Sequence, residues 1–372
     1  MNRVFGLDAA RTLAIAMVVL SHAHQRSHDI GVFGVELFFA LSGFLIGAIL
    51  FRNLPDREPW TLSAVANFWS RRWWRTLPNY FLFLVVSIGF HQLFGSLPPF
   101  GEIAPYFAFC QNLTDSGGDF FGVSWSLCVE EWFYLLFPLA LLAVHRLTRS
   151  RLLTFAIVGV VFLGVSPAIR QWVFTRETAA DAARFVTLAR MDAIAYGVAA
   201  AVFVQMARPS PRLRIGLALA GSGLLALVLF RHALPDSARQ TAFTQLLLTA
   251  TPAAFALMMP LLGSWEKLPA ALESFRLPVT RISQWSYSIY LAHYPILMTT
   301  YAAFGDTREL PGVNLLSKLT GLSIAIFVAR SVYRNFEVRL TSLRPSESGP
   351  GHGPEKAAPT LAAATPPSPS LP

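Results

Sequence analysis

The chain has 372 residues, of which 54% are hydrophobic and 14% are charged, and its mean hydropathy is +0.48. Soluble globular proteins carry about 25% charged residues, so this balance excludes a soluble globular class and indicates a multi-pass membrane protein. The net charge of +9 does not indicate a nucleic-acid partner. Its basic residues lie in short clusters between apolar segments, which is the pattern that membrane orientation produces.

Ten apolar segments are long enough to cross a bilayer and predict an all-α polytopic fold of about ten transmembrane helices. They cover residues 4–23, 31–51, 76–94, 123–144, 152–168, 185–206, 213–231, 242–262, 283–303 and 313–333. If the N-terminus is cytoplasmic, nineteen Lys and Arg residues fall in cytoplasmic connections and eight, Arg170 and Arg184 among them, in outer connections. The excess of positive charge on one side predicts that both termini are cytoplasmic.

The composition changes near residue 345, so residues 1–344 are predicted to form the transmembrane domain. Residues 345–372 are rich in Pro, Ala, Ser and Gly, which predicts a disordered cytoplasmic tail. The N-terminal apolar run is interrupted by Asp8 and Arg11, which favours a retained first helix over a signal peptide. Cys110 and Cys128 match no metal-site spacing, so no metal is expected, and the sequence does not decide whether they pair.

The first segment carries an unusual load of polar side chains for a spanning helix. Arg11 and His22 are eleven positions apart, close to three whole turns, so they share one helix face about 16 Å apart along the axis. Asp8, three residues before Arg11, joins the same face. A charge placed against lipid costs at least about 2.5 kcal/mol, so this face is predicted to line an interior cavity.

The predicted topology sorts the other intramembrane polar residues by depth. The inner group consists of Asp8 and Arg11 in the first segment and a cluster of arginines before the third segment. Guanidinium groups are planar, charged hydrogen-bond donors, so this cluster is suited to binding a polyphosphate. Anchoring at the headgroups is the alternative, and it is the commoner role of juxtamembrane arginine. The members of this cluster are Arg71, Arg72 and Arg75. The outer group comprises His22, Glu36, Glu130, Glu131, Arg190 and Asp192.

Within the outer group, His22 is the candidate general base, because a neutral imidazole is suited to that role near neutral pH. Glu130 is expected to orient the imidazole of His22 or the acceptor. Asp192 either pairs with Arg190 or takes a direct part. His293, in the middle of the ninth segment, is either a packing histidine or a site residue.

Five stretches of the sequence occur in the order found in one known family. They are LDAARTLAIAMVVLSH, GVELFFALSGFLIG, RRWWRTLP, VSWSLCVEEWFYLLFP and SYSIYLAHYPI. Together they resemble the acyltransferase-3 family of bacterial membrane O-acyltransferases, from Gly6 to about Phe336. The resemblance implies that Arg11 and His22 are the essential pair of the first helix and that Arg72 and Arg75 are the pair of the third. It further implies that Ser42 and Gly43 belong to a signature turn of the second helix. Glu130 would be the functional acid of the fourth helix.

The resemblance also implies an activity, a donor and a location. A multi-pass protein of the bacterial inner membrane would move an acyl group, with acetyl favoured, from cytoplasmic acyl-CoA to a hydroxyl. The acceptor would be an envelope polysaccharide, lipopolysaccharide or other glycan, including a lipid-linked sugar. Acyl-CoA would be a substrate, and no permanently bound cofactor is implied. Acceptor recognition is expected to rest on the membrane domain or on a periplasmic or glycan-assembly partner.

Several alternatives stay open at this point. Acyl-CoA phosphates would bind Arg11, Arg71, Arg72 and Arg75, and His22 would act either as a base or through an acyl-histidine intermediate. The rival functions are acylation of a small, macrolide-like acceptor and proton-coupled transport of a glycan or acyl group, since buried ionisable residues also serve proton relays. An inactive scaffold for glycan assembly is a further alternative. The sequence does not identify the acyl chain, the acceptor or the oligomeric state.

Overall fold

The computed structural model describes residues 3–23, 28–118, 120–175, 182–232, 241–305 and 311–345, and this part of the chain contains helices and no strands. The predicted all-α class is therefore confirmed. The predicted tail lies outside the described residues except for Pro345, so its disorder stays a prediction.

Each of the ten predicted segments overlaps one long helix. The long helices are α1 (Phe5–Ala23), α2 (His28–Asn53), α3 (Leu62–Leu93), α5 (Trp125–Thr148), α6 (Arg151–Phe174), α8 (Met191–Ala207), α9 (Pro211–His232), α10 (Thr241–Leu262), α11 (Arg276–Phe304) and α12 (Pro311–Val332). Within the described ranges, six of them, α1, α2, α5, α6, α9 and α12, are long and apolar enough to cross a membrane. That all ten cross, and that both termini are cytoplasmic, stays a prediction.

Short helices fill the connections. They are α4 (Phe100–Phe107), η2 (Gly122–Ser124), α7 (Ala182–Phe185) and η4 (Ala270–Phe275), followed after α12 by the π-helical η5 (Tyr333–Glu337) and α13 (Val338–Thr341).

The third long helix begins much earlier than predicted. α3 starts at Leu62, where Thr61 caps it by accepting a hydrogen bond from the amide of Ala64 at 3.3 Å. The predicted start was residue 76, because the arginines before it lower the local hydropathy. Arg72 and Arg75 therefore lie inside a helix rather than at its mouth, and the helix fixes the direction of both side chains.

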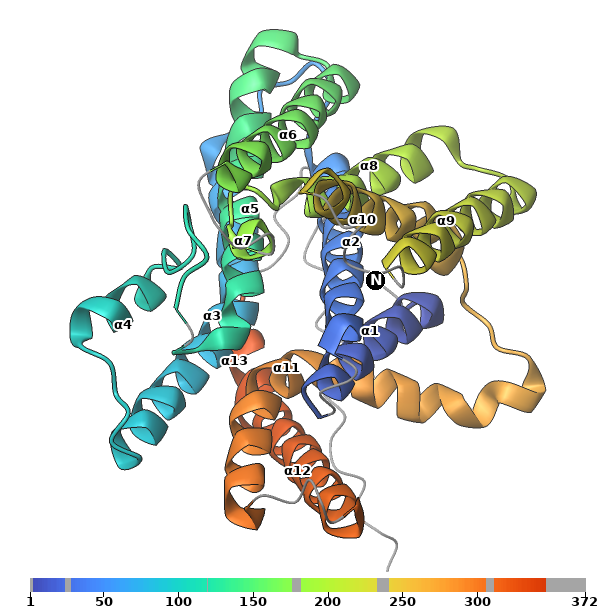
Figure 1. The fold of residues 1–372 in the computed structure, drawn as a ribbon. Coiled ribbons are helices and arrows are strands. Elements are labelled where there is room, and N and C mark those ends of the chain that lie inside the picture. Colours follow the sequence, from blue (N-terminus) through green and yellow to red (C-terminus); the bar gives the residue numbers. More distant parts are fainter. Residues whose placement is uncertain are drawn as a thin grey trace, which may run out of the picture.

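Helix α2 runs through the middle of the bundle, where it packs against α1, α8 and α10 (Figure 1). Glycines allow the close approach of α2 and α8. A Cβ atom at Gly43 would lie 1.9 Å from the carbonyl oxygen of Ile194, and one at Gly197 would lie 2.2 Å from that of Ala40. The two backbones are thus in direct contact, as is common where small residues meet between membrane helices.

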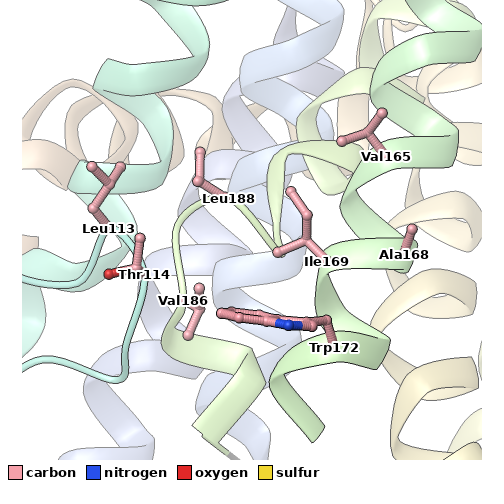
Figure 2. A pocket seen from close by; sticks show the side chains of 8 residues that line it. All are labelled: Leu113, Thr114, Val165, Ala168, Ile169, Trp172, Val186 and Leu188. Atoms are coloured by element: carbon pink, nitrogen blue, oxygen red, sulfur yellow. The ribbon is translucent and has the colours of Figure 1, made fainter. Parts of the chain in front are cut away.

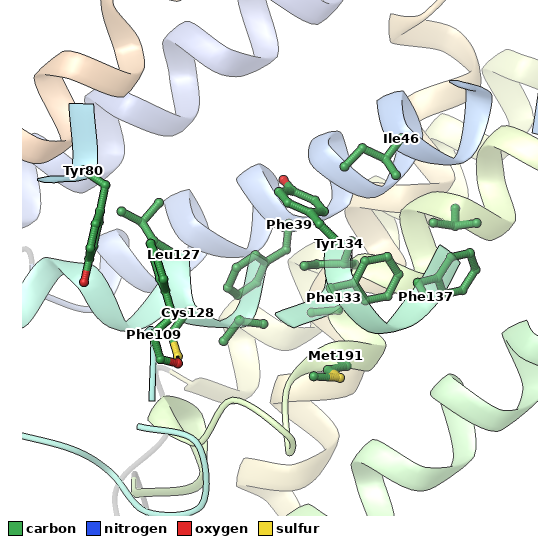
Figure 3. Packing of buried hydrophobic residues seen from close by; sticks show 14 of the residues in the cluster. Phe39, Ile46, Tyr80, Phe109, Leu127, Cys128, Phe133, Tyr134, Phe137 and Met191 are labelled. Carbon is green, nitrogen blue, oxygen red and sulfur yellow. Dashed lines mark hydrogen bonds between the residues drawn. The ribbon is translucent and has the colours of Figure 1, made fainter. Parts of the chain in front are cut away.

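Aromatic side chains of α5 also pack against α2. Figure 3 shows Phe133, Tyr134 and Phe137 of α5 near Phe39 and Ile46 of α2, all of them buried in one apolar cluster. The rings of Phe133 and Phe137 are stacked, with centroids 4.8 Å apart. This packing sets the rotation of α5 and therefore where its polar side chains point.

Two buried ion pairs tie α2, α6 and α8 together. Arg190 donates to Glu36, and Arg170 donates to Asp192 at 2.5 Å, with all four side chains at most 1% exposed. Of the two alternatives for Asp192, pairing with Arg190 is not what the structure shows, because residues two apart at the start of a helix face different directions and Asp192 pairs with Arg170 instead. Arg170 was assigned to an outer connection but lies inside α6.

We expect Gly43→Ala to lower the melting temperature of the purified protein, because the added methyl group meets backbone atoms that cannot move independently. Overpacking of this kind costs about 1–3 kcal/mol. The matched control is Gly89→Ala in α3, where a Cβ atom meets nothing within 4 Å. That change should be neutral or stabilise the helix by up to about 1 kcal/mol. Equal melting temperatures for the two variants would contradict the close contact of α2 with α8.

We expect Asp192→Ala to reduce the yield and melting temperature of folded protein sharply, because it leaves the charge of Arg170 buried without its carboxylate. Breaking a buried pair costs about 3–5 kcal/mol. The control is Asp56→Ala, which breaks a partly exposed pair with Arg151 (3.2 Å) and should cost about 0–1 kcal/mol. The idea fails if the two variants melt alike.

Candidate active site

A first group of polar side chains surrounds the start of α1. The buried carboxylate of Asp8 accepts hydrogen bonds from Ser283 of α11 at 2.7 Å and from Arg3 at 2.6 Å. Arg11 lies 4.0 Å from the same carboxylate and 3.4 Å from the hydroxyl of Ser283. The charges of α1 are therefore turned toward α11, as the predicted interior face requires.

Arg11 also lies close enough to Arg72 and Arg75 of α3 for their charges to act on it electrostatically. We call these three side chains the arginine cluster. Like charges brought together in a protein raise the local potential and attract anions. Arg75 is exposed and so can be reached by a ligand, whereas Arg11 is half-buried. The nearest carboxylates are shared with other donors, since Glu337, which faces Arg75, accepts from Asn79 at 2.8 Å and from Ser288 at 2.7 Å.

Arg72 is held by α5. Its guanidinium lies over the ring of Tyr134, 4.3 Å from the centroid, and donates to the hydroxyl of that tyrosine. The Tyr134 hydroxyl is also 2.5 Å from the hydroxyl of Ser42 in α2. Gly43, the neighbour of Ser42, lies at the contact of α2 with α8. The predicted signature turn of α2 thus contacts both α5 and α8.

Both acids of α5 lie beside the arginine cluster. Glu130 interacts with Arg72, Tyr134 and Ser42, and Glu131 accepts a hydrogen bond from Thr76 of α3 at 2.8 Å. The described partners of Glu130 are Arg72 of the arginine cluster and the hydroxyls of Tyr134 and Ser42, which does not support the expectation that Glu130 orients His22. The reason is depth, since Glu130 is five residues, about 7.5 Å, further along α5 than Trp125. The alternative, that Glu130 orients the acceptor, stays a prediction.

Arg71 takes a different contact from the other arginines of α3. Its guanidinium donates to the carbonyl oxygen of Pro345 at 2.8 Å, so it holds the C-terminal segment against α3. The sequence predicted that Arg71, Arg72 and Arg75 act together on a ligand. In the structure Arg72 and Arg75 lie in the arginine cluster, whereas Arg71 contacts the C-terminal segment.

The second polar group lies at the other end of α1. A cavity of about 310 Å³ is lined by His22 together with side chains from α5, α7 and α11. These include Trp125, Arg184, Phe185, Tyr290 and Tyr294. The His22 ring stands edge-on to Tyr294, with centroids 5.3 Å apart, and its Nδ1 atom is 3.2 Å from Nε2 of His293. We call this space the histidine cavity.

The walls of the histidine cavity are fixed by hydrogen bonds. The hydroxyl of Tyr290 donates to the carbonyl oxygen of Val123 at 2.8 Å and lies 2.6 Å from the hydroxyl of Ser126. These bonds join α11 to the start of α5. The guanidinium of Arg184 lies 5.6 Å from the centroid of the Trp125 ring, which brings a positive charge to the cavity.

Three helices connect the arginine cluster with the histidine cavity. α1 carries Arg11 and His22, α11 carries Ser283 and His293, and α5 carries Tyr134 and Trp125. Because nine to eleven helical residues rise by about 13–16 Å, the two groups are separated by about half the thickness of a bilayer core. The same rigid elements therefore position both groups.

Several residues of these groups were not anticipated from the sequence. Tyr134, Tyr290 and Trp125 lie in recognised motifs, but they carry no charge, and the depth of intramembrane charges therefore did not predict them. Arg184 was placed in an outer connection, because α7 has only four residues and gives no periodic pattern.

A separate, apolar cavity of about 370 Å³ lies between α6 and the segment that follows α7. Figure 2 shows Val186 and Leu188 of that segment facing Trp172 and Ile169 of α6. Thr114 is the one polar side chain among the eight that line it. This cavity offers no group for acid–base or anion chemistry.

Neither cysteine is paired, since Cys110 is exposed and Cys128 is buried as free thiols. Among the described residues, no three His, Cys, Asp or Glu side chains are grouped as metal ligands would be.

One family model and one relative match this chain over most of its length, and another relative matches less than half of it. The acyltransferase-domain model of the acyltransferase-3 family matches residues 4–331. Peptidoglycan O-acetyltransferase OatA of Listeria monocytogenes is 26% identical over 353 residues, which are 89% of this chain and 54% of that protein. O-acetyltransferase OatA of Staphylococcus aureus is 28% identical over 180 residues, which are 43% of this chain and 28% of that protein.

The chain thus spans about half the length of the Listeria relative and a smaller part of the Staphylococcus one. No solved structure matches it. The match over residues 4–331 covers nearly all of the described helices, and on this ground the chain belongs to the acyltransferase-3 family, a family of membrane acyltransferases.

Proposed function

We propose that this protein is an O-acetyltransferase of the bacterial inner membrane that moves an acetyl group from cytoplasmic acetyl-CoA to a hydroxyl of an envelope glycan. The observation that carries the proposal is the joining of the arginine cluster to the histidine cavity by α1, α5 and α11. The names of the relatives support acetyl as the group transferred and a peptidoglycan-like glycan as the acceptor.

The arginine cluster is the proposed site for the phosphates of the donor. Guanidinium groups bind phosphate oxygens through paired, charge-assisted hydrogen bonds, and Arg75 is accessible for such contacts. Glu130 and Tyr134 would position Arg72 rather than touch the reacting atoms. The pantetheine arm would then extend along α1 toward His22, which brings the thioester to the histidine cavity.

In the histidine cavity, His22 would act as the general base. The acceptor oxygen attacks the thioester carbonyl while its proton passes to His22, so a C–O bond forms and the C–S bond breaks. The thiolate of CoA leaves with the electron pair of the C–S bond and takes up the proton from the imidazolium. Arg184 lies at the same cavity and would help to hold a polar acceptor.

We expect Arg75→Ala to weaken binding of acetyl-CoA by about tenfold or more, because one charge-assisted contact to phosphate contributes about 1.5–3 kcal/mol. Arg75→Lys should restore the affinity only in part, because an ammonium group cannot make the bidentate contact. The measurement is calorimetric titration of the purified protein with CoA. The control is Arg146→Ala in the last turn of α5, which should bind CoA as the wild type does. Equal affinities of Arg75→Ala and the wild type for CoA would contradict the proposal that the donor binds at the arginine cluster.

We expect His22→Gln to lower transfer at least ~100-fold, which is the low end of general-base contributions, while CoA binding stays nearly unchanged. Glutamine keeps a hydrogen-bonding group but cannot accept the proton. Transfer is measured as labelled acetyl appearing on a peptidoglycan oligosaccharide. The control is His91→Gln near the end of α3, whose ring contacts Ser96 and Phe120 and which should retain full transfer. Substantial transfer by His22→Gln would assign the base to another residue.

A further inference from the structure

His293 is a fully buried side chain whose ring contacts fix its own protonation pattern. Its Nδ1 atom lies 2.8 Å from the carbonyl oxygen of Tyr290 and 3.1 Å from that of Ile289. A carbonyl oxygen only accepts hydrogen bonds, so the Nδ1 atom of His293 must carry a hydrogen. In the neutral ring, Nε2 of His293 is then an acceptor.

The acceptor nitrogen of His293 faces Nδ1 of His22 at 3.2 Å. The same Nδ1 atom of His22 lies 2.9 Å from the carbonyl oxygen of Val18. The hydroxyl of Ser21 lies 3.4 Å from the same atom but donates its own hydrogen to the carbonyl oxygen of Val18 at 2.7 Å, so it too presents a lone pair. All three neighbours are acceptors, and one hydrogen on Nδ1 of His22 is shared among them. Neutral His22 is therefore the Nδ1–H tautomer, in which Nε2 is the nitrogen that carries the lone pair.

The two rings are held in this relation by contacts at three levels between α1 and α11. Thr12 donates to the carbonyl oxygen of Val279 at 2.8 Å, and Ser283 donates to Asp8 at 2.7 Å. Beyond the histidines, Tyr301 donates to the carbonyl oxygen of Ala23 at 3.0 Å. The facing of His22 and His293 is thus fixed by the packing of both helices and not by one flexible side chain.

We infer that His293 is a positioning residue that holds His22 in the Nδ1–H tautomer, so that Nε2 of His22 is the atom that accepts the proton of the acceptor hydroxyl. This inference rests on the proposed function of His22 as a base. In serine proteases an aspartate performs the same task, and a change that gives the wrong histidine tautomer lowers kcat about 10⁴-fold. Here the group that accepts the hydrogen bond from Nδ1 of His22 is a second, buried imidazole, that of His293. Unlike an aspartate, it adds no negative charge to the membrane interior.

The test compares two variants of similar size in the purified, full-length protein. In His293→Gln the side-chain oxygen can still accept the hydrogen on Nδ1 of His22. In His293→Leu this side-chain acceptor is lost. Nδ1 of His22 then keeps only the Ser21 hydroxyl and the carbonyl oxygen of Val18, which also accepts the backbone amide of His22 within α1. We expect His293→Leu to lower kcat at least ~100-fold without a matching loss of CoA affinity, and His293→Gln to stay within ~10-fold of the wild type.

The decisive readout is the ¹⁵N NMR spectrum of protein labelled at the histidine rings, with the His22 signals assigned from their loss in His22→Gln. We expect the Nδ1–H tautomer of His22 in the wild type and in His293→Gln, and a mixture or the Nε2–H tautomer in His293→Leu. A merely structural role of His293 would leave the tautomer unchanged. The inference is overturned if His22 is the Nε2–H tautomer in the wild type, or if its tautomer does not respond to His293→Leu.

The spectra require no turnover, so they separate this inference from the proposed function. An active His22→Gln enzyme would remove the base assignment, whereas a His22 tautomer that is indifferent to residue 293 would overturn the inference alone. If His293→Leu gives reduced yield, the soluble folded fraction of His293→Gln still reports whether an acceptor oxygen at this position preserves the tautomer and kcat. Loss of both in that variant would contradict the role assigned to His293.

Discussion

The structure depends on one constraint, which is that a charged side chain inside an apolar bundle must meet a partner within the protein. Glu36 with Arg190, and Asp192 with Arg170, satisfy this constraint in pairs and so fix α2, α6 and α8 against one another. The arginine cluster satisfies it less completely, because its carboxylates also serve hydroxyl and amide donors. The positive charge that remains in the cluster makes it the natural place for an anionic ligand.

The arginine cluster and the histidine cavity are built on the same three helices. α1, α5 and α11 each present one side chain to the arginine cluster and another to the histidine cavity, so the two sites cannot move independently of one another. A donor with a charged end and a reactive end is suited to such an arrangement. Binding at the charged end would place the thioester beside a base whose tautomer is already set, which reduces the reorganisation needed for reaction.

The parts of this structure that were predictable are those set by local rules. The all-α class follows from apolar runs of bilayer length, and the common face of Arg11 and His22 follows from the 3.6-residue period. The start of α3 was missed because arginines lower hydropathy without breaking a helix, and Arg170 was placed outside α6 for the same reason. The partners of Glu130 and Arg190 depend on the depth and rotation of packed helices, which hydropathy and spacing do not encode.

In the reaction that we propose, donor and acceptor reach the transfer site from opposite faces of the membrane. The direct measurement is transfer in proteoliposomes whose orientation is reported by a membrane-impermeant maleimide on Cys110, since this thiol is exposed and Cys128 is buried. With Cys110 outside, we expect that a peptidoglycan oligosaccharide added outside is acetylated only when acetyl-CoA is loaded inside. Equal acetylation when acetyl-CoA is supplied only on the Cys110 side would contradict it.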